Sequence, residues 1–467
     1  MKNKFHYADK KILVLISLLP IFFYGYNLFF YTLNIPFGDD FPAVLGYLNL
    51  TYESITLEHK IQLLFSRHAE HQIIICKLFA LAYYLIFEKI NFIYLAYVGN
   101  LAIIFLAIIF YKSVKPNRDK LILFLPVTFI LFNFSYGESS TWAMAALSNF
   151  YMIFFAFAAI YFINLESKKY LLIAIIFALL ASFSFGGGLL VFAPLILICL
   201  YQGRHKDGLL LVFILLAALY VYFLYDPLGG LSRPAISLDI KNLADMLLFF
   251  IVFLGSPLKN IYLSFALGLV LLLIFFYLTI KKYFRHNIVT YSGMIFILIL
   301  AAGASYSRFS FGIGYALVSR YAFYSSVYIC LCYLAFIEIR LPSKKIHTAI
   351  AARALVLSLA PISLISYGLF PIQAGLKNML NIPYVYFVQK AAGSTYFPID
   401  ALEVFYEEQA NKITSNLFVS NIEPLNARIH AALETQKKLL NQGKVAFGEP
   451  RADSEILARA IKNRIYY

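Results

Sequence analysis

A succession of apolar stretches separated by short basic loops constrains this chain more than any other feature. Eighteen of its 39 Lys and Arg residues lie at the N-terminus and in five such loops, at 112–120, 168–169, 204–206, 281–285 and 340–345. Basic loops of membrane proteins stay on the cytoplasmic side, because charge is costly to move through hydrocarbon. The pattern predicts an all-α polytopic membrane protein whose N-terminus and basic loops lie in the cytoplasm.

The apolar stretches are interpreted as crossings, because about 20 helical residues span a hydrocarbon core of roughly 30 Å. The sequence predicts eleven of them, at 11–33, 91–113, 120–135, 148–165, 169–185, 187–202, 207–225, 258–280, 288–304, 319–339 and 346–369. This count places every basic loop inside and the C-terminus outside, provided that 70–89 and 243–256 stay at the outer interface. Several stretches are short, which leaves a count between about ten and thirteen open.

Composition supports this class of protein and restricts the kinds of binding partner that are expected. Hydrophobic residues make up 61% of the 467 residues and charged residues 13%, unlike soluble domains. The net charge of +15 is carried mostly by the basic loops, so no nucleic-acid partner is predicted. The cysteines lack metal-ligand spacing and are interpreted as small core residues, at positions Cys76, Cys199, Cys330 and Cys332.

The chain divides near residue 370 into two predicted domains. Residues 1–370 hold the transmembrane bundle, including an outer 34–90 loop with interfacial helices. Residues 371–467 contain eleven Lys and Arg, nine Asp and Glu, and no apolar run long enough to cross. This part is predicted to be a small helical domain on the outer side, with helices near 401–413 and 423–440.

Polar side chains gather in the predicted outer loops, beginning with the adjacent carboxylates of Asp39 and Asp40 at the end of the first crossing. A partly desolvated interface tunes the proton affinity of a carboxylate or supplies it with a cationic partner. Either condition suits a general base that takes a proton from a sugar hydroxyl. A solvated helix-capping pair is the alternative interpretation.

A second group of charged residues lies at the head of the apolar run 73–87. If the segment is helical, Arg67, Glu70 and His71 share one face, and Lys77 follows on the next turns. Cations on the polar face of an interfacial helix are well placed to meet a lipid phosphate. An ordinary amphipathic helix would produce the same pattern.

Two further outer segments carry candidate binding residues. Glu138 and Trp142, the only Trp, lie in a short loop where an aromatic ring beside a carboxylate could hold a sugar, although interfacial anchoring explains a lone Trp equally well. Arg308 and the pair Arg320-Tyr321 border a glycine-containing turn before the tenth crossing. Arginines in such a turn favour an anionic ligand.

These ordered motifs resemble the bacterial and phage O-antigen glycosyltransferases of the Gtr type, which have the multi-helix GT-C architecture. The resemblance rests on Gly38-Asp39-Asp40, on His68-Ala69-Glu70-His71, and on Arg308 through Ser319-Arg320-Tyr321, and covers about 40–370. Relatives often have Arg after the His-Glu-His run, where this chain has Gln72. Phosphate binding is therefore assigned to other residues, namely Arg67, His71, Lys77, Arg308 and Arg320.

The resemblance implies an enzyme of the bacterial inner membrane with its active site on the periplasmic face. Such an enzyme moves a sugar, usually glucose, from undecaprenyl phosphate to the O-antigen of lipopolysaccharide, a modification that changes serotype. We expect a single inverting displacement with Asp40 or Asp39 as base, Asp40 being preferred because it lies farther from the helix end. We expect Arg308 and Arg320 to stabilise the departing phosphate, and Glu70, Glu138, Trp142 and Tyr321 to contact sugar or acceptor.

No redox cofactor is implied, and an acidic pair could bind Mg²⁺, so metal dependence stays open. Two other classes also stay open. An O-antigen polymerase or ligase would share the helices and the outer arginines but would transfer whole glycans. A transporter or flippase of lipid-linked sugars should show charges in mid-membrane or two similar halves, and neither is evident in the sequence.

Overall fold

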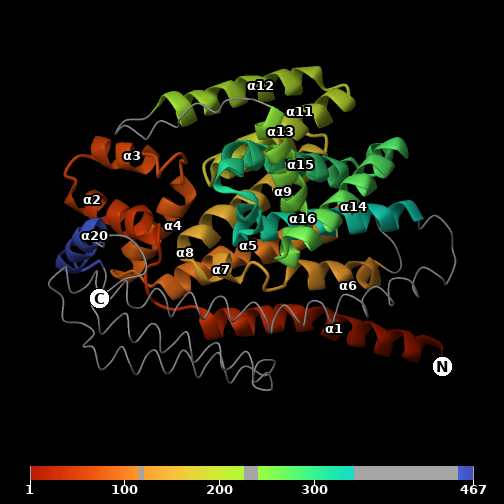
Figure 1. The fold of residues 1–467 in the computed structure, drawn as a ribbon, viewed down its shortest axis with the longest axis horizontal. Coiled ribbons are helices and arrows are strands. Elements are labelled where there is room, and N and C mark those ends of the chain that lie inside the picture. The colour runs from red at the N-terminus through yellow and green to blue at the C-terminus, as the bar shows by residue number, and fades with distance from the viewer. Residues whose placement is uncertain (1, 115–119, 226–239, 341–450, 466–467) are drawn as a thin grey trace.

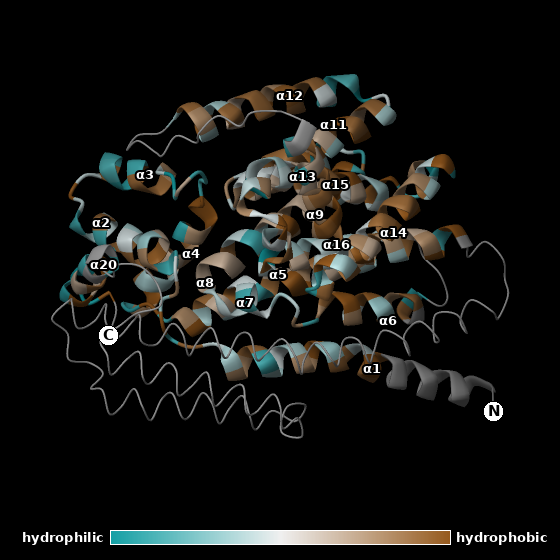
Figure 2. Cartoon of the chain, in the orientation of Figure 1, coloured by the Kyte–Doolittle hydropathy of each residue, from teal (hydrophilic) through white to brown (hydrophobic). Residues whose placement is uncertain are grey.

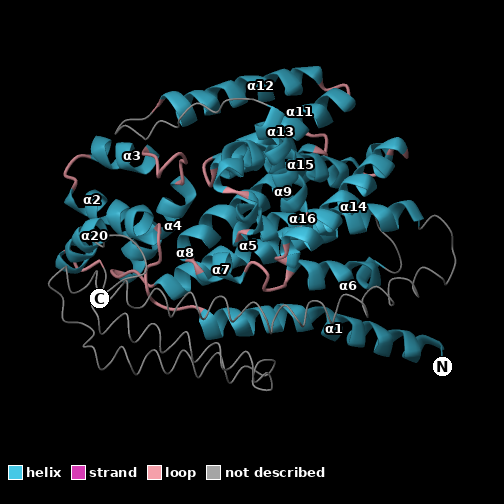
Figure 3. Cartoon of the chain, in the orientation of Figure 1, coloured by secondary structure: helices cyan, strands magenta, loops and turns pink. Residues whose placement is uncertain are grey.

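The computed structural model describes residues 2–114, 120–225, 240–340 and 451–465. Within these ranges the chain is helical, with turns and one isolated bridge but without β-strands (Figure 3). Stretches long and apolar enough to cross a membrane occur seven times in this part of the chain, at Val14–Tyr31, Phe92–Ser113, Ala143–Ile163, His205–Leu224, Ile261–Ile280, Ile288–Phe311 and Ser319–Ile339. The predicted all-α membrane-protein class is confirmed.

These seven stretches correspond to seven of the predicted crossings. They contain α1 (Lys2–Tyr31), α5 (Phe92–Ser113), α9 (Tyr151–Ile163), α12 (His205–Leu219), α14 (Ile261–Ile280), α15 (Ile288–Arg308) and α16 (Ser319–Arg340). Three other predicted crossings are shorter helices, namely α6 (Lys120–Leu131), α10 (Lys168–Ser182), and η3 (Gly186–Val191) continued by α11 (Phe192–Tyr201). The crossing expected at 346–369 lies outside the described residues, so the total of eleven stays a prediction.

Burial of the apolar helices depends on their place in the bundle and not on how apolar they are. The stretch Ala143–Ile163 is 83% buried and forms the centre of the bundle, whereas the α12 and α14 stretches are 22% buried and lie at its periphery (Figure 1). Apolar residues cover inner and peripheral helices alike, as Figure 2 shows. An apolar periphery is what hydrocarbon requires. Close packing at the centre depends on small residues, because a Cβ at Gly99 would stand 2.5 Å from the Cβ of Ala146.

One end of the bundle collects loops that carry basic residues. Asn287 donates to the carbonyl of Ser113 at 3.1 Å and to the carboxylate of Glu338 at 3.0 Å, which joins the ends of α5, α15 and α16. The rings of Tyr201 and Phe284 lie 5.8 Å apart and join the end of α11 to η6 (Tyr283–Arg285). The N-terminus of α1 lies toward the same end, on the right of Figure 1.

The opposite end holds the 34–91 segment and the last described helix. The segment contains η1 (Phe41–Gly46), α2 (Tyr47–Glu53), α3 (Leu57–Phe65) and α4 (Ile74–Phe87). At 14 residues α4 is about 21 Å long, shorter than a crossing requires. The helix α20 (Arg451–Lys462) packs here, where Asn49 donates to the carbonyl of Ile456 at 2.9 Å. The other expected parts of the 371–467 domain lie outside the described residues.

The remaining elements shape the interior near this end. A broken stretch comprises α7 (Gly137–Thr141), α8 (Ala143–Ala145) and the π-helical turn η2 (Ala146–Phe150), which leads into α9. A further π-helical turn, η4 (Tyr220–Leu224), ends α12, and η1 is of the same type. Between α12 and α14 lie α13 (Ile240–Leu254) and η5 (Ser256–Leu258), and η7 (Phe309–Phe311) and η8 (Ile313–Leu317) join α15 to α16. Irregular backbone at these positions leaves room for polar side chains inside the bundle.

Candidate functional site

Two cavities meet at the end of the bundle opposite the basic loops. The first, here called the apolar cavity, measures about 550 Å³ and lies among η3, the end of α12, η4, α15 and the start of α16. The second, here called the acidic cavity, measures about 560 Å³ and lies among the 37–39 turn, the 68–71 loop, α7 and the 315–320 segment. Their shared lining residues are Glu70, His71, Phe185, Arg308 and Arg320.

The two adjacent aspartates point to different surroundings. Asp40 is 1% exposed, and its carboxylate accepts the backbone N–H of Phe37 at 3.0 Å and that of Met144 at 2.9 Å. Asp39 lines the acidic cavity, its side chain 51% exposed, with its Oδ1 3.4 Å from Nε2 of His68. The structure therefore brings Asp39 to the cavity, while Asp40 is buried and held by backbone N–H groups. The alternative of a solvated helix-capping pair does not describe Asp40, which is 1% exposed and whose side chain forms no cap hydrogen bond with η1.

The 67–72 segment is a turn, so the expectation of one helical face for Arg67, Glu70 and His71 is wrong. The backbones of His68 and His71 bond to each other at 2.7 and 2.9 Å, and Ala69 between them has φ of +49°. A left-handed residue inside a short bridge reverses the chain and cannot continue a helix. The reversal still presents Glu70 and His71 to both cavities.

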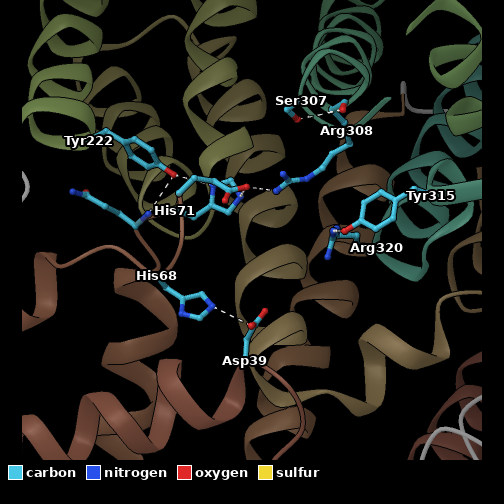
Figure 4. A network of polar contacts seen from close by, with 11 residues as sticks. Asp39, His68, His71, Tyr222, Ser307, Arg308, Tyr315 and Arg320 are labelled. Carbon is cyan, nitrogen blue, oxygen red and sulfur yellow. Dashed lines mark hydrogen bonds and ion pairs between the residues drawn. The ribbon is translucent and has the colours of Figure 1, made fainter. Parts of the chain in front are cut away.

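Glu70 contacts both His71 and Arg308 at the boundary of the cavities. Figure 4 shows the polar network to which His71, Tyr222 and Arg308 belong. Oε1 of Glu70 lies 3.3 Å from Nε2 of His71 and accepts a hydrogen bond from Arg308. The other ring nitrogen of His71 lies 3.3 Å from the hydroxyl of Tyr222. The hydrogen bond with His71, reinforced by Arg308, holds the pKa of Glu70 well below its ordinary value, against the opposing effect of burial. Glu70 is therefore a fixed negative charge.

Arg320 lines both cavities and is held by aromatic residues. Its Nη2 donates to the hydroxyl of Tyr315 at 2.8 Å, and its guanidinium lies 5.7 Å and 5.4 Å from the ring centres of Tyr315 and Tyr321. Over the described ranges, no carboxylate lies within ion-pair distance of Arg320. A half-buried cation held in this way offers its charge to an anionic ligand in the cavity.

Arg67 and Lys77, both expected to bind phosphate, have structural contacts. Arg67 borders the apolar cavity, but its Nη2 donates to the carbonyls of Tyr222 at 3.1 Å and Phe223 at 2.6 Å and so anchors η4. Lys77 is 3% exposed, and its Nζ donates to the carbonyl and hydroxyl of Ser66 at 2.6 and 2.9 Å. It lines neither cavity. Lys77 therefore ties α4 to the end of α3.

Glu138 and Trp142 lie together on the wall of the acidic cavity. The Trp142 ring stands edge-on to Phe37 at 5.0 Å and also covers Gly38, where a Cβ would come within 3.5 Å of the ring. Gly38 has φ of +49°, so the turn into Asp39 needs glycine for its backbone as well as for this contact. The indole is thereby held in place beside the half-exposed Asp39 carboxylate.

The cavity residues without an assigned role in the sequence include His68, Tyr222 and Tyr315. His68 stands beside Asp39, and its place in the His-Glu-His run was the available signal. Tyr222 and Tyr315 lay in or beside apolar stretches, where a tyrosine is indistinguishable from lipid-facing residues. The Tyr222 hydroxyl reaches His71 across 151 positions of sequence, whereas the Tyr315 hydroxyl reaches Arg320 only five positions further along.

No group of three or more His, Cys, Asp or Glu side chains within the described ranges is arranged to hold a metal ion. The four cysteines are free and buried, as expected of core residues. The chain matches no family model, no curated protein and no solved structure.

Proposed function

We propose that this protein is an integral membrane glycosyltransferase that moves a sugar from a polyprenyl phosphate to an O-antigen acceptor. The observation that supports it best is the meeting of an apolar cavity and an acidic cavity at Arg308, Glu70 and Arg320. A lipid-linked donor needs an apolar surface next to cations, and a sugar acceptor needs a polar surface next to a base. This arrangement offers both within one site.

The donor phosphate is assigned to Arg320, with Arg308 as a second cation. Arg320 is oriented by Tyr315 before any ligand arrives, so its charge needs little reorganisation when the sugar–phosphate bond breaks. The phosphate leaves as a monoester, and arginine donors are suited to its oxygens. Glucose is adopted as the donor sugar from the resemblance to Gtr-type enzymes.

The base is assigned to Asp39 in place of Asp40, because Asp39 lines the acidic cavity and Asp40 is engaged by two backbone N–H groups. In one inverting displacement the acceptor hydroxyl oxygen forms a bond to the anomeric carbon while the bond from that carbon to the phosphate oxygen breaks. The hydroxyl proton passes to the Asp39 carboxylate. The electron pair of the broken bond stays with the phosphate oxygen, whose charge Arg320 and Arg308 stabilise.

The orientation that we propose places the site on the periplasmic face of the bacterial inner membrane. Support comes from the separation of the polar network from the loops with basic residues, which lie at the other end of the bundle. The positive-inside rule assigns those loops to the cytoplasm.

The experiment is mass spectrometry of O-antigen from cells that express wild type, Asp39→Asn or Arg320→Ala at equal membrane levels. We expect one hexose added per repeat by wild type and its loss in both variants. Glu58→Gln is the matched control, because Glu58 is an exposed carboxylate on α3, outside both cavities. An unmodified repeat with altered chain length would favour a polymerase, and lipid-linked sugar moved without being transferred would favour a flippase.

A further inference from the structure

The apolar cavity lies between two helices that share only some of their neighbours. Both α12 and α15 pack against α11 and η3, but α12 also packs against α10, whereas α15 packs against α9, α13 and α16. Leu219 and Tyr222 line the cavity on the α12 and η4 side, and Leu300 lines it on the α15 side. Leu190 of η3 also lines it, and its Cδ1 would lie 3.6 Å from a Cβ at Gly303. The cavity is therefore a slot between two membrane helices.

The slot reaches the surface of the bundle. Phe223 lines the cavity and is 56% exposed, and Gly303 lines it from α15 and is also exposed. The α12 stretch is 22% buried. Most of its exposed side chains are apolar, among them Leu209, Phe213, Leu216, Tyr220 and Leu224. Such a surface faces hydrocarbon in a bilayer. The exposed part of the slot that Phe223 and Gly303 line, here called its mouth, consequently faces lipid chains.

The two ends of the slot differ in charge. Arg308 and Arg320 line it where it meets the acidic cavity, and Phe223 and Gly303 line it where it is exposed. Arg67 also borders the exposed end, but its guanidinium is engaged by the carbonyls of Tyr222 and Phe223. A ligand that matches both ends has a phosphate at one end and a long hydrocarbon chain at the other. The chain gains little free energy in the slot, because membrane hydrocarbon is as apolar as leucine. The mouth therefore governs access, and the arginines supply the affinity.

We propose that the opening between α12 and α15 is the entry and binding site for the hydrocarbon chain of the lipid-linked donor. This inference rests on the proposed function, since it takes the donor to be a polyprenyl phosphate whose phosphate reaches Arg320. A long chain must extend through the mouth into the bilayer. A short, water-soluble prenyl analogue fits inside the slot and does not need the mouth to be open.

Gly303 is the position at which the mouth can be closed with little disturbance. A Cβ there would have a single neighbour within 4 Å, Cδ1 of Leu190 at 3.6 Å, which is ordinary van der Waals contact. Gly303→Leu should therefore fold and place its side chain across the mouth. Ala302→Leu is the matched control, because Ala302 is the preceding α15 residue, is exposed and does not line the cavity.

The test compares sugar transfer by purified wild type, Gly303→Leu and Ala302→Leu with a long-chain and a short-chain prenyl phosphate donor. We expect Gly303→Leu to lower kcat/KM for the long-chain donor about tenfold or more, while changing the value for the short-chain donor less than about twofold. Ala302→Leu should match wild type with both donors. Equal effects of Gly303→Leu on both donors, including no effect on either, would overturn the proposed entry site.

A second measurement separates failure of this inference from failure of the proposed function. A polyprenyl phosphate with a photoreactive group on its chain should label peptides that contain Phe223 or Gly303 in wild type and label them less in Gly303→Leu. If wild type transfers no sugar from either donor, the glycosyltransferase proposal fails, and the labelling alone decides the lipid site. Labelling spread evenly over the membrane helices would overturn the site irrespective of transfer.

Discussion

Glu70 and Arg308 form an ion pair across 238 positions of sequence, at the boundary between the two cavities. His71 holds the same Glu70 oxygen at 3.3 Å. Arg308 thus already has an anionic partner, whereas Arg320 has aromatic neighbours and Tyr315 as its hydrogen-bond acceptor. A donor phosphate would meet Arg320 first and would share Arg308 with Glu70.

Glu70→Gln should weaken the fold in a pH-dependent way. The pKa of Glu70 is lowered in the folded protein, so its ion pair contributes stability above the ordinary glutamate pKa of about 4.3, and this contribution is lost as the pH falls toward the lower folded value. At neutral pH we expect a loss of about 1 to 3 kcal/mol. Thermal unfolding of detergent-solubilised wild type and Glu70→Gln between neutral and acidic pH measures this difference in stability. A wild-type advantage that stays constant below pH ~4 would contradict the ion-pair contribution.

Asp39→Asn should reduce the activity of the protein, whereas Asp40→Asn should reduce its stability. Asp39→Asn should lower kcat by about 10²- to 10⁴-fold and leave the unfolding temperature unchanged, because it removes the proposed base from the cavity wall. Asp40→Asn should cost about 1 to 3 kcal/mol of stability, because its amide N–H₂ would face a backbone N–H of Phe37 or Met144. Transfer assays paired with thermal unfolding distinguish the two. The reverse pattern would return the base to Asp40.

Arg320→Lys should reduce kcat/KM for the donor by about 10- to 100-fold, because an ammonium cannot give two parallel hydrogen bonds to a phosphate and loses the stacking on Tyr321. Arg285→Lys is the control, since Arg285 is an exposed arginine of η6. Donor titrations at fixed acceptor concentration measure the effect. Equal kcat/KM in the two variants would remove Arg320 from the phosphate site.

Lys77→Met should destabilise the protein without weakening the binding of the sugar donor. The substitution removes the buried donor of the Ser66 carbonyl and hydroxyl, while the Leu63 carbonyl still accepts from Ser66. We expect a cost of about 2 to 4 kcal/mol. Thermal unfolding should report this loss, and KM for the donor should stay that of wild type at a temperature where both are folded. A raised KM with unchanged stability would restore the phosphate-binding prediction for Lys77.

The sequence alone determined the class of the fold. A helix must satisfy its own backbone in hydrocarbon, and charge is excluded from that region, so apolar length and basic loops report membrane helices locally, residue by residue. The same rule predicted that the polar clusters lie on the side of the membrane opposite the basic loops. It left the number of crossings open, because α6 and α10 are apolar but shorter than the seven longest apolar stretches.

Only the tertiary structure decided which polar residues share a site. Asp39 and Asp40 are neighbours of the same type, and a turn at Gly38 sends one to the cavity and the other to the backbone of Met144. Lys77 and Arg320 are both cations beside apolar runs. The ammonium of Lys77 is hydrogen-bonded to Ser66, whereas Arg320 lines both cavities. Such outcomes depend on contacts between distant parts of the chain, and helical periodicity carries no information about them.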